Sequence, residues 1–177
     1  MNVVGAGGLG TEIALDTLAT HMSTSTVRYD PDTHHGLYIR FAPSGGLITI
    51  YRTGSYHIVG VKSIEEMHNT SEQFLHELTN LGIDYDDDAA GVEVRNLVGT
   101  ATYLDSLDLN AVAIALGLEQ VEYEPEQFPG LIYRPRNRDG VYLLFNSGEM
   151  VIMGLTTVAE IEAAYYSVVK TLDRSLS

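Results

Sequence analysis

Apolar and polar residues alternate along the second half of the chain with the period of β-strands. Between residues 92 and 100 every second position lies on one face, and Asn96 and Val98 belong to that face. Four further strands are predicted at residues 121–123, 131–134, 141–145 and 150–153. Short turns join these strands, which favours antiparallel pairing.

Apolar residues at helical spacing predict two helices in the same half. The first is short and is stopped by Gly117. Its predicted apolar face is formed by Leu107, Ala111, Ile114 and Ala115. The second helix covers residues 157–172, and residues 64–81 show the same pattern in the first half. Because a helix with one apolar stripe must bury it, the predicted fold class is α+β, with helices on one face of an antiparallel sheet.

The chain repeats itself at a distance of 94 residues. Residues 2–61 align with residues 96–155 without a gap. Fifteen of these sixty positions are identical, where chance gives roughly four at ordinary residue frequencies. A long period that occurs twice indicates a duplicated unit rather than a solenoid. The sequence therefore predicts a first repeat over residues 1–84, a linker over residues 85–90 and a second repeat over residues 91–177.

One face of the predicted sheet has no helix to cover it, and yet it is rich in apolar residues. Its members in the second repeat share one pleat phase within their strands. They are Asn96, Val98, Leu143, Phe145, Val151 and Met153. An apolar surface of this kind indicates an interaction site.

The composition is acidic. The chain has 24 Asp and Glu against 10 Lys and Arg, a net charge of −14, and only Lys62 and Lys170 are lysines. Excess acid with scarce lysine fits a protein that works in molar salt, where the Debye length falls to about 3 Å. Cysteine is absent, which excludes disulfides and thiolate chemistry.

Residues 123–134, Tyr-Glu-Pro-Glu-Gln-Phe-Pro-Gly-Leu-Ile-Tyr-Arg, resemble the second-repeat signature of the TATA-box-binding protein family, archaeal type. The strings at residues 96–99, 143–148 and 151–154 resemble the neighbouring strands of that family, and the two-repeat layout matches over nearly the whole chain. The acidic composition adds a halophilic character. The resemblance implies a saddle of two α+β repeats, with a curved antiparallel sheet of ten strands and four helices on its convex face.

The same resemblance implies which residues bind DNA in the minor groove. Asn2 and Asn96 would hydrogen-bond base acceptors, and Phe128 with Phe145 would prise apart one base step. Arg40 and Arg134 would reach phosphates. The other implied DNA-binding positions are Val4, His34, Tyr51, Val59, Val98, Ile132, Leu143, Val151 and Met153. Glu124 and Glu126 would meet the next initiation factor, transcription factor B.

The first repeat departs from the family pattern. His34 stands where a wedge phenylalanine is expected, His35 stands where a proline follows it, and Tyr51 replaces the second wedge residue. Thr49 and His57 also stand where the second repeat has apolar residues. The sequence leaves open whether His34 stacks on DNA, forms hydrogen bonds or does neither.

Two motifs suggest other chemistry. Residues 5–10 fit Gly-x-Gly-x-x-Gly, with Asp30 about twenty residues further on, as in a dinucleotide-binding fingerprint. The hairpins that follow, in place of βαβ units, argue against a nucleotide-binding enzyme. His34, His35 and His57 suggest a metal site, but adjacent histidines in a strand point to opposite faces, which favours simple exposed histidines.

The leading hypothesis is a general transcription initiation factor. It binds and bends A·T-rich, TATA-like promoter DNA and recruits transcription factor B and RNA polymerase. The alternative is a divergent paralogue that regulates transcription through protein contacts and holds DNA weakly or with altered preference. Neither is an enzyme or needs a cofactor. The apolar open sheet face also suggests a homodimer of the free protein. The chain has no apolar run of about 18 residues and no signal-peptide pattern, so no membrane partner is expected. The resemblance to archaeal DNA-binding proteins implies the cytoplasm of a prokaryotic cell, at the nucleoid.

Overall fold

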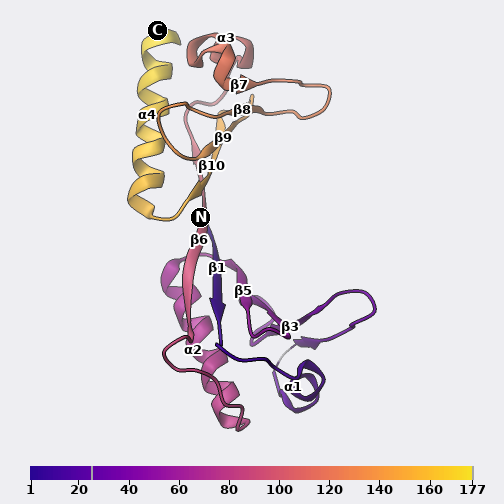
Figure 1. Cartoon of the computed structure of the whole chain (residues 1–177). Coiled ribbons are helices and arrows are strands. Elements are labelled where there is room, and N and C mark those ends of the chain that lie inside the picture. The colour runs from indigo at the N-terminus through magenta and orange to yellow at the C-terminus, as the bar shows by residue number, and fades with distance from the viewer. Residues whose placement is uncertain (25, 177) are drawn as a thin grey trace. The chain divides into compact units, whose positions relative to one another are not determined.

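The computed structural model describes residues 1–24 and 26–176 (Figure 1). The chain separates into two compact units, one formed by Asn2–Arg95 and the other by the residues from Asn96 on. The boundary lies inside strand β6 (Gly91–Thr102), which therefore contributes residues to both units.

The first unit is a sheet with two helices. Its elements are β1 (Asn2–Gly8), α1 (Leu15–His21), β2 (Thr26–Arg28), β3 (Gly36–Arg40), β4 (Leu47–Tyr51), β5 (Tyr56–Val61) and α2 (Ile64–Asn80). The strand order is β2-β3-β4-β5-β1, and β6 lies next to β1. Helix α2 starts at a capped end, because the Ser63 side chain accepts a hydrogen bond from the backbone N–H of Glu66.

The second unit repeats this plan with the second part of β6 as its first strand. Its further elements are α3 (Leu109–Leu116), the short 3₁₀ helix η1 (Leu118–Gln120), β7 (Val121–Glu122), β8 (Leu131–Tyr133), β9 (Val141–Leu144), β10 (Glu149–Leu155) and α4 (Val158–Leu176). The strand order is β6-β10-β9-β8-β7. It mirrors the order of the first unit element by element.

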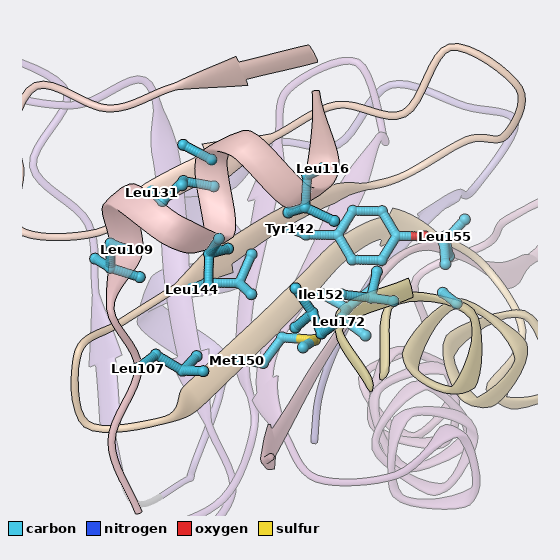
Figure 2. Close-up of a cluster of buried hydrophobic side chains, with 14 residues drawn as sticks. Leu107, Leu109, Leu116, Leu131, Tyr142, Leu144, Met150, Ile152, Leu155 and Leu172 are labelled. Carbon is cyan, nitrogen blue, oxygen red and sulfur yellow. The ribbon is translucent and has the colours of Figure 1, made fainter. Parts of the chain in front are cut away.

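Each sheet buries one face against its own helices. Figure 2 shows the cluster of the second unit, in which side chains of α3, the strands and α4 meet. In the first unit, Tyr56 of β5 packs edge-on against Phe74 of α2 with ring centroids 5.3 Å apart, and both are fully buried. Burying each such side chain contributes about 1.5–3 kcal/mol, so this face carries most of the stability of each unit.

A glycine bulge interrupts the last strand of each unit. Gly60 in β5 has a φ of +78° and Gly154 in β10 has a φ of +86°. The register of each strand against its neighbour shifts at this point. Glycine adopts a positive φ without steric cost, which explains why both repeats have glycine here.

Two details of the predicted helices are wrong. Helix α3 begins only at Leu109, because the Asp108 carboxylate caps it by accepting hydrogen bonds from the backbone N–H groups of Asn110 and Ala111. Its buried residues are Leu109, Val112, Ala113 and Leu116, whereas Ile114, a predicted face residue, is 72% exposed. Helix α4 continues to Leu176 instead of ending at residue 172.

The predicted fold class is confirmed. The described residues form two α+β repeats with ten strands and four α-helices, and every strand pair with a defined register is antiparallel. Over residues 1–24 and 26–176, none of the helices has the length and apolar character needed to cross a membrane.

Candidate nucleic-acid interface

The predicted site residues of the second repeat lie on the sheet face opposite its helices. In β9, Tyr142 and Leu144 are fully buried toward the helices, whereas Leu143 between them is only partly buried. Val151 and Met153 of β10 are partly buried in the same alternation. We call this side of each repeat the open face. In the second repeat it comprises Asn96, Val98, Ile132, Leu143, Phe145, Val151 and Met153.

The strand register brings the apolar residues of this face together. Ile132 of β8 is paired with Leu143 of β9, and Leu143 is paired with Val151 of β10. Two residues further along β10, Met153 is paired with Val141 of β9. Because directly paired residues project to the same side, these side chains form a continuous apolar row across three strands.

Phe128 and Phe145 stand together beside this row. Their ring centroids are 5.9 Å apart and the rings meet edge to face at 67°. A Cβ atom placed on Gly130 would lie 2.8 Å from a ring atom of each phenylalanine. Glycine at this position therefore makes the room that the pair occupies.

The first repeat builds the same arrangement from other residues. His34 and Tyr51 occupy the positions of Phe128 and Phe145, with ring centroids 6.2 Å apart at 44°. His34 also lies against Tyr38, at 4.8 Å and 31°. The backbone N–H of Gly36 donates to His34 Nδ1 at 2.9 Å, so in the neutral ring Nε2 carries the proton. His34 thus stands at the position that aligns with Phe128 but holds a polar ring there.

The rest of the first open face is more polar than the second. Tyr38, Thr49 and His57 form the paired row that corresponds to Ile132, Leu143 and Val151. Thr49 is only 8% exposed, because its neighbours cover it, and His57 is exposed and packs edge-on against Tyr51 at 5.7 Å. His35 is exposed in the loop between β2 and β3.

The two asparagines are each fixed through the side-chain oxygen. Asn96 Oδ1 accepts a hydrogen bond from the backbone N–H of Gly154 at 2.7 Å. Asn2 Oδ1 accepts one from Lys62 Nζ at 3.2 Å. In both residues the NH₂ group is therefore the part that is left to donate to a ligand. Val4, Val59 and Val98 are partly buried on the same faces.

The two arginines predicted to reach phosphates have partners within the chain. Arg134 Nη1 lies 2.6 Å from Glu122 Oε1 in an ion pair whose side chains are 52% and 67% exposed. Arg40 Nη1 donates to the backbone oxygen of Gly45 at 2.6 Å. An ion pair as exposed as that of Arg134 contributes little to stability, so a phosphate can compete for the Arg134 guanidinium. Arg40 is half-buried.

Glu124 and Glu126 lie in the loop between β7 and β8, and both are exposed. The backbone oxygen of Glu124 accepts hydrogen bonds from the N–H groups of Gln127 and Phe128 at 2.9 and 3.0 Å. This tight turn directs the loop and also positions Phe128. In the first repeat, the backbone oxygen of Asp30 accepts the corresponding hydrogen bonds from the N–H groups of Thr33 and His34.

Several residues of this surface were missed by sequence reasoning. They are Arg28, Tyr38 and Glu122 on the open faces, and Lys62 and Gly154 as partners of the asparagines. The alignment of the two repeats contains a signal for some of them, because Arg28 aligns with Glu122 and Gly60 aligns with Gly154.

The structure gives little support to a dinucleotide-binding site or a metal site. Most of the glycine-rich segment at residues 5–10 lies within strand β1, which ends at Gly8, and helix α1 begins only at Leu15. Gly5 and Gly7 permit close packing instead, since a Cβ atom on Gly5 would lie 2.5 Å from Met67 Sδ. Among the described residues, no group of three or more His, Asp or Glu side chains is placed to hold a metal ion.

Comparison with known proteins decides the family. A family model described as transcription factor TFIID, or TATA-binding protein (TBP), matches residues 1–81 and 91–175. The chain belongs to the TATA-binding protein family. TATA-box-binding protein C of Halobacterium salinarum is 48% identical to it, over 93% of this chain and 91% of that protein. The TATA-box-binding protein of Haloarcula marismortui is 40% identical, over 97% and 90%.

A solved structure of the TATA-binding protein family has the same fold. Methanococcus jannaschii TBP matches with a TM-score of 0.84 at 32% identity and covers 98% of this chain and 97% of its own. The similarity to proteins of salt-loving archaea agrees with the acidic composition. Membership of this family confirms the predicted class, a DNA-binding transcription factor.

Proposed function

We propose that this chain is a general transcription initiation factor of a halophilic archaeon. It binds A·T-rich, TATA-like promoter DNA through the open faces of its repeats, bends the DNA, and recruits transcription factor B and RNA polymerase at the nucleoid. The observation that carries the proposal is the second open face. There an apolar row, an aromatic pair and an oriented amide lie on one surface.

These groups fit the minor groove of A·T-rich DNA. The groove presents only acceptors at A·T pairs, and an amino group is added at G·C pairs. The NH₂ group of Asn96 can donate to such acceptors, whereas Leu143 and Val151 offer no acceptor to a guanine amino group. An A·T-rich site therefore leaves fewer polar groups unpaired.

Phe128 and Phe145 fit the role of a wedge at one base step. They are rigid, apolar, partly exposed and already in contact with each other. Inserting such a pair unstacks the bases and kinks the duplex, at a cost of a few kcal/mol per step that wider contact repays. This mode of binding depends little on ion pairs, which suits a protein with a net charge of −14.

Glu124 and Glu126 support the proposed contact with transcription factor B. Both are exposed, and the hydrogen-bonded turn that contains them is anchored next to Phe128. A basic surface on the partner would complement them. In the free protein, the same apolar open face is available for pairing with a second copy, which sedimentation of the DNA-free protein would detect.

The polar first repeat supports one alternative, a paralogue with weak or altered DNA binding. His34, Thr49 and His57 replace apolar residues there. Under this alternative, the double substitution His34→Phe with His35→Pro strengthens binding to TATA-like DNA. An unchanged affinity would count against it.

The proposal is tested by fluorescence anisotropy in about 2 M KCl, a salt concentration at which long-range charge effects are screened. Duplexes with a central TATA-like or G·C-rich site are compared. We expect saturable binding only to the first. Phe145→Ala should weaken binding about 30-fold, corresponding to ~2 kcal/mol. Tyr166→Ala, at an aromatic of α4 that is 68% exposed, is the matched control and should change nothing. Equal binding to both duplexes, or equal effects of both variants, would refute the proposal.

A further inference from the structure

The outer edge of the first repeat carries a charge arrangement that the second repeat lacks. Glu122 and Arg134 form an ion pair on the open face of the second repeat. The aligned residues of the first repeat are Arg28 and Arg40, so two cations stand where the second repeat has a neutral pair. Arg28 of β2 is paired with Tyr38 of β3, which places it on the open face beside His34.

A hollow of about 370 Å³ lies at this edge. It is lined by Arg28, Asp30, Thr33, His34 and Tyr38. The donors that these residues can offer a ligand are the Arg28 guanidinium, the Tyr38 hydroxyl and Nε2 of the neutral His34 ring. The Thr33 hydroxyl already donates to the backbone oxygen of Asp30 at 3.3 Å. Asp30 contributes one carboxylate and Arg28 one guanidinium to the lining, whereas the Arg40 guanidinium donates to the backbone oxygen of Gly45.

The corresponding hollow of the second repeat has the opposite character. Its volume is about 160 Å³, and it is lined by Glu122, Glu124, Gln127, Phe128, Gly130 and Ile132. Two carboxylates and an apolar floor make it unsuitable for an anion. The difference between the repeats is therefore concentrated at this edge, where Arg28 replaces an acid and polar rings replace Phe128 and Ile132.

We propose that the first-repeat hollow binds one backbone phosphate of DNA, with Arg28 as its principal ligand and the side chains of His34 and Tyr38 as further donors. A guanidinium can donate two parallel hydrogen bonds to the two free oxygens of a phosphodiester. The first repeat then grips the DNA backbone where the second inserts an aromatic wedge. This inference rests on the proposed DNA-binding function and adds a polarity to it, since the two halves of the DNA site are held by different chemistry.

The test substitutes Arg28→Glu, which installs the residue that the second repeat has at the equivalent position. That precedent and the exposure of Arg28 predict an unchanged melting temperature. Arg28→Gln removes the charge if the first variant fails to fold. Arg138→Glu is the matched control, since it makes the same charge change in the exposed loop between β8 and β9.

Affinity for a TATA-like duplex is measured over a range of KCl concentrations. Losing one phosphate contact should reduce the slope of log K against log salt by about 0.9 for Arg28→Glu. The slope should stay unchanged for Arg138→Glu. Equal slopes for the wild-type protein and Arg28→Glu would overturn the inference. A wild-type protein that binds no DNA would instead overturn the proposed function itself, so the two failures are distinguishable.

A second arm locates the phosphate. Each phosphate of the duplex is replaced in turn by an uncharged methylphosphonate. At one position near one end of the site, this replacement should lower the DNA affinity of the wild-type protein and leave the affinity of Arg28→Glu unchanged. The inference would be overturned if, at every position, the methylphosphonate lowered the affinity of Arg28→Glu as much as that of the wild-type protein. A third result would also overturn it: inorganic phosphate raises the melting temperature of the wild-type protein but not of Arg28→Glu, and the two bind DNA equally well. The hollow would then bind a free anion and not the DNA backbone.

Discussion

The side-chain oxygen of Asn96 accepts a hydrogen bond from the backbone N–H of Gly154 at 2.7 Å. Gly154 is the positive-φ residue of the bulge in β10. A carbonyl oxygen must face that N–H, so the bulge fixes which end of the Asn96 amide is turned away from the backbone. A bulge in the strand thus determines the hydrogen-bond polarity of the proposed DNA contact.

Asn96→Asp is expected to keep this bond and reverse the group presented to DNA. An aspartate oxygen accepts from Gly154 as before, but its second oxygen meets base acceptors that it cannot satisfy. We expect a melting temperature close to that of the wild-type protein and TATA-duplex affinity lower by about 10- to 100-fold, or 1–3 kcal/mol. Asn137→Asp, in the exposed loop between β8 and β9, is the control for added charge. Equal losses in both variants would contradict the account.

Gly130→Ala should disturb the packing of Phe128 and Phe145 while leaving both phenylalanines in the sequence. The added Cβ would lie 2.8 Å from ring atoms of both Phe128 and Phe145, so the rings must move apart. Overpacking of this kind costs about 1–3 kcal/mol. We expect a lower melting temperature and a smaller DNA bend. Gly45→Ala, where the nearest atom is 3.4 Å from the new Cβ, is the control that should leave the bend unchanged.

Two buried tyrosines should respond in opposite ways to loss of the hydroxyl group. Tyr56 forms hydrogen bonds with Ser71 at 2.8 Å and Gly91 O at 2.9 Å. The Tyr142 hydroxyl is buried and has no hydrogen-bond partner among the described residues. Tyr56→Phe should lower the free energy of unfolding by about 1–3 kcal/mol, because it leaves partners unpaired. Tyr142→Phe should leave it unchanged or higher. Chemical denaturation of both variants checks this, and a large loss in Tyr142→Phe would contradict it.

Tyr103 should resist ionisation. Its hydroxyl donates to Asp173 Oδ1 at 2.5 Å, and this hydrogen bond, with desolvation and the negative carboxylate, raises the pKa of Tyr103 to about 12. Because the folded-state pKa lies above the ordinary value of 10.0, the contribution to stability is complete below pH 10 and disappears as the pH rises through about 12. The difference in phenolate absorbance between the wild-type protein and Tyr103→Phe should show this late ionisation. Ionisation near pH 10 would show that the bond is absent in solution.

Much of the fold followed from local patterns. The 94-residue repeat, the alternation in β9 and β10 and the spacing in α2 were sufficient to predict two α+β repeats with an apolar open face. Helix α3 was harder, because it is apolar on most sides and the cap at Asp108 decides which residues face the core.

The polar details of the site could not be predicted in the same way. The partners of Asn96 and Arg134 are 58 and 12 residues away in sequence and meet only through strand register and a bulge. His34 could be aligned with a wedge position, but its bond to Gly36 and its contact with Tyr38 depend on the turn between β2 and β3. Such contacts arise from tertiary geometry and have no periodic signal in the sequence.

End-to-end FRET on a duplex with a central TATA-like site tests the central claim most directly. It is measured in about 2 M KCl, where only close contacts survive screening, with and without transcription factor B. The account predicts saturable bending by the protein alone, reduced by Phe145→Ala and unaffected by Tyr166→Ala. Folded protein that leaves the duplex straight both with and without transcription factor B would contradict the account.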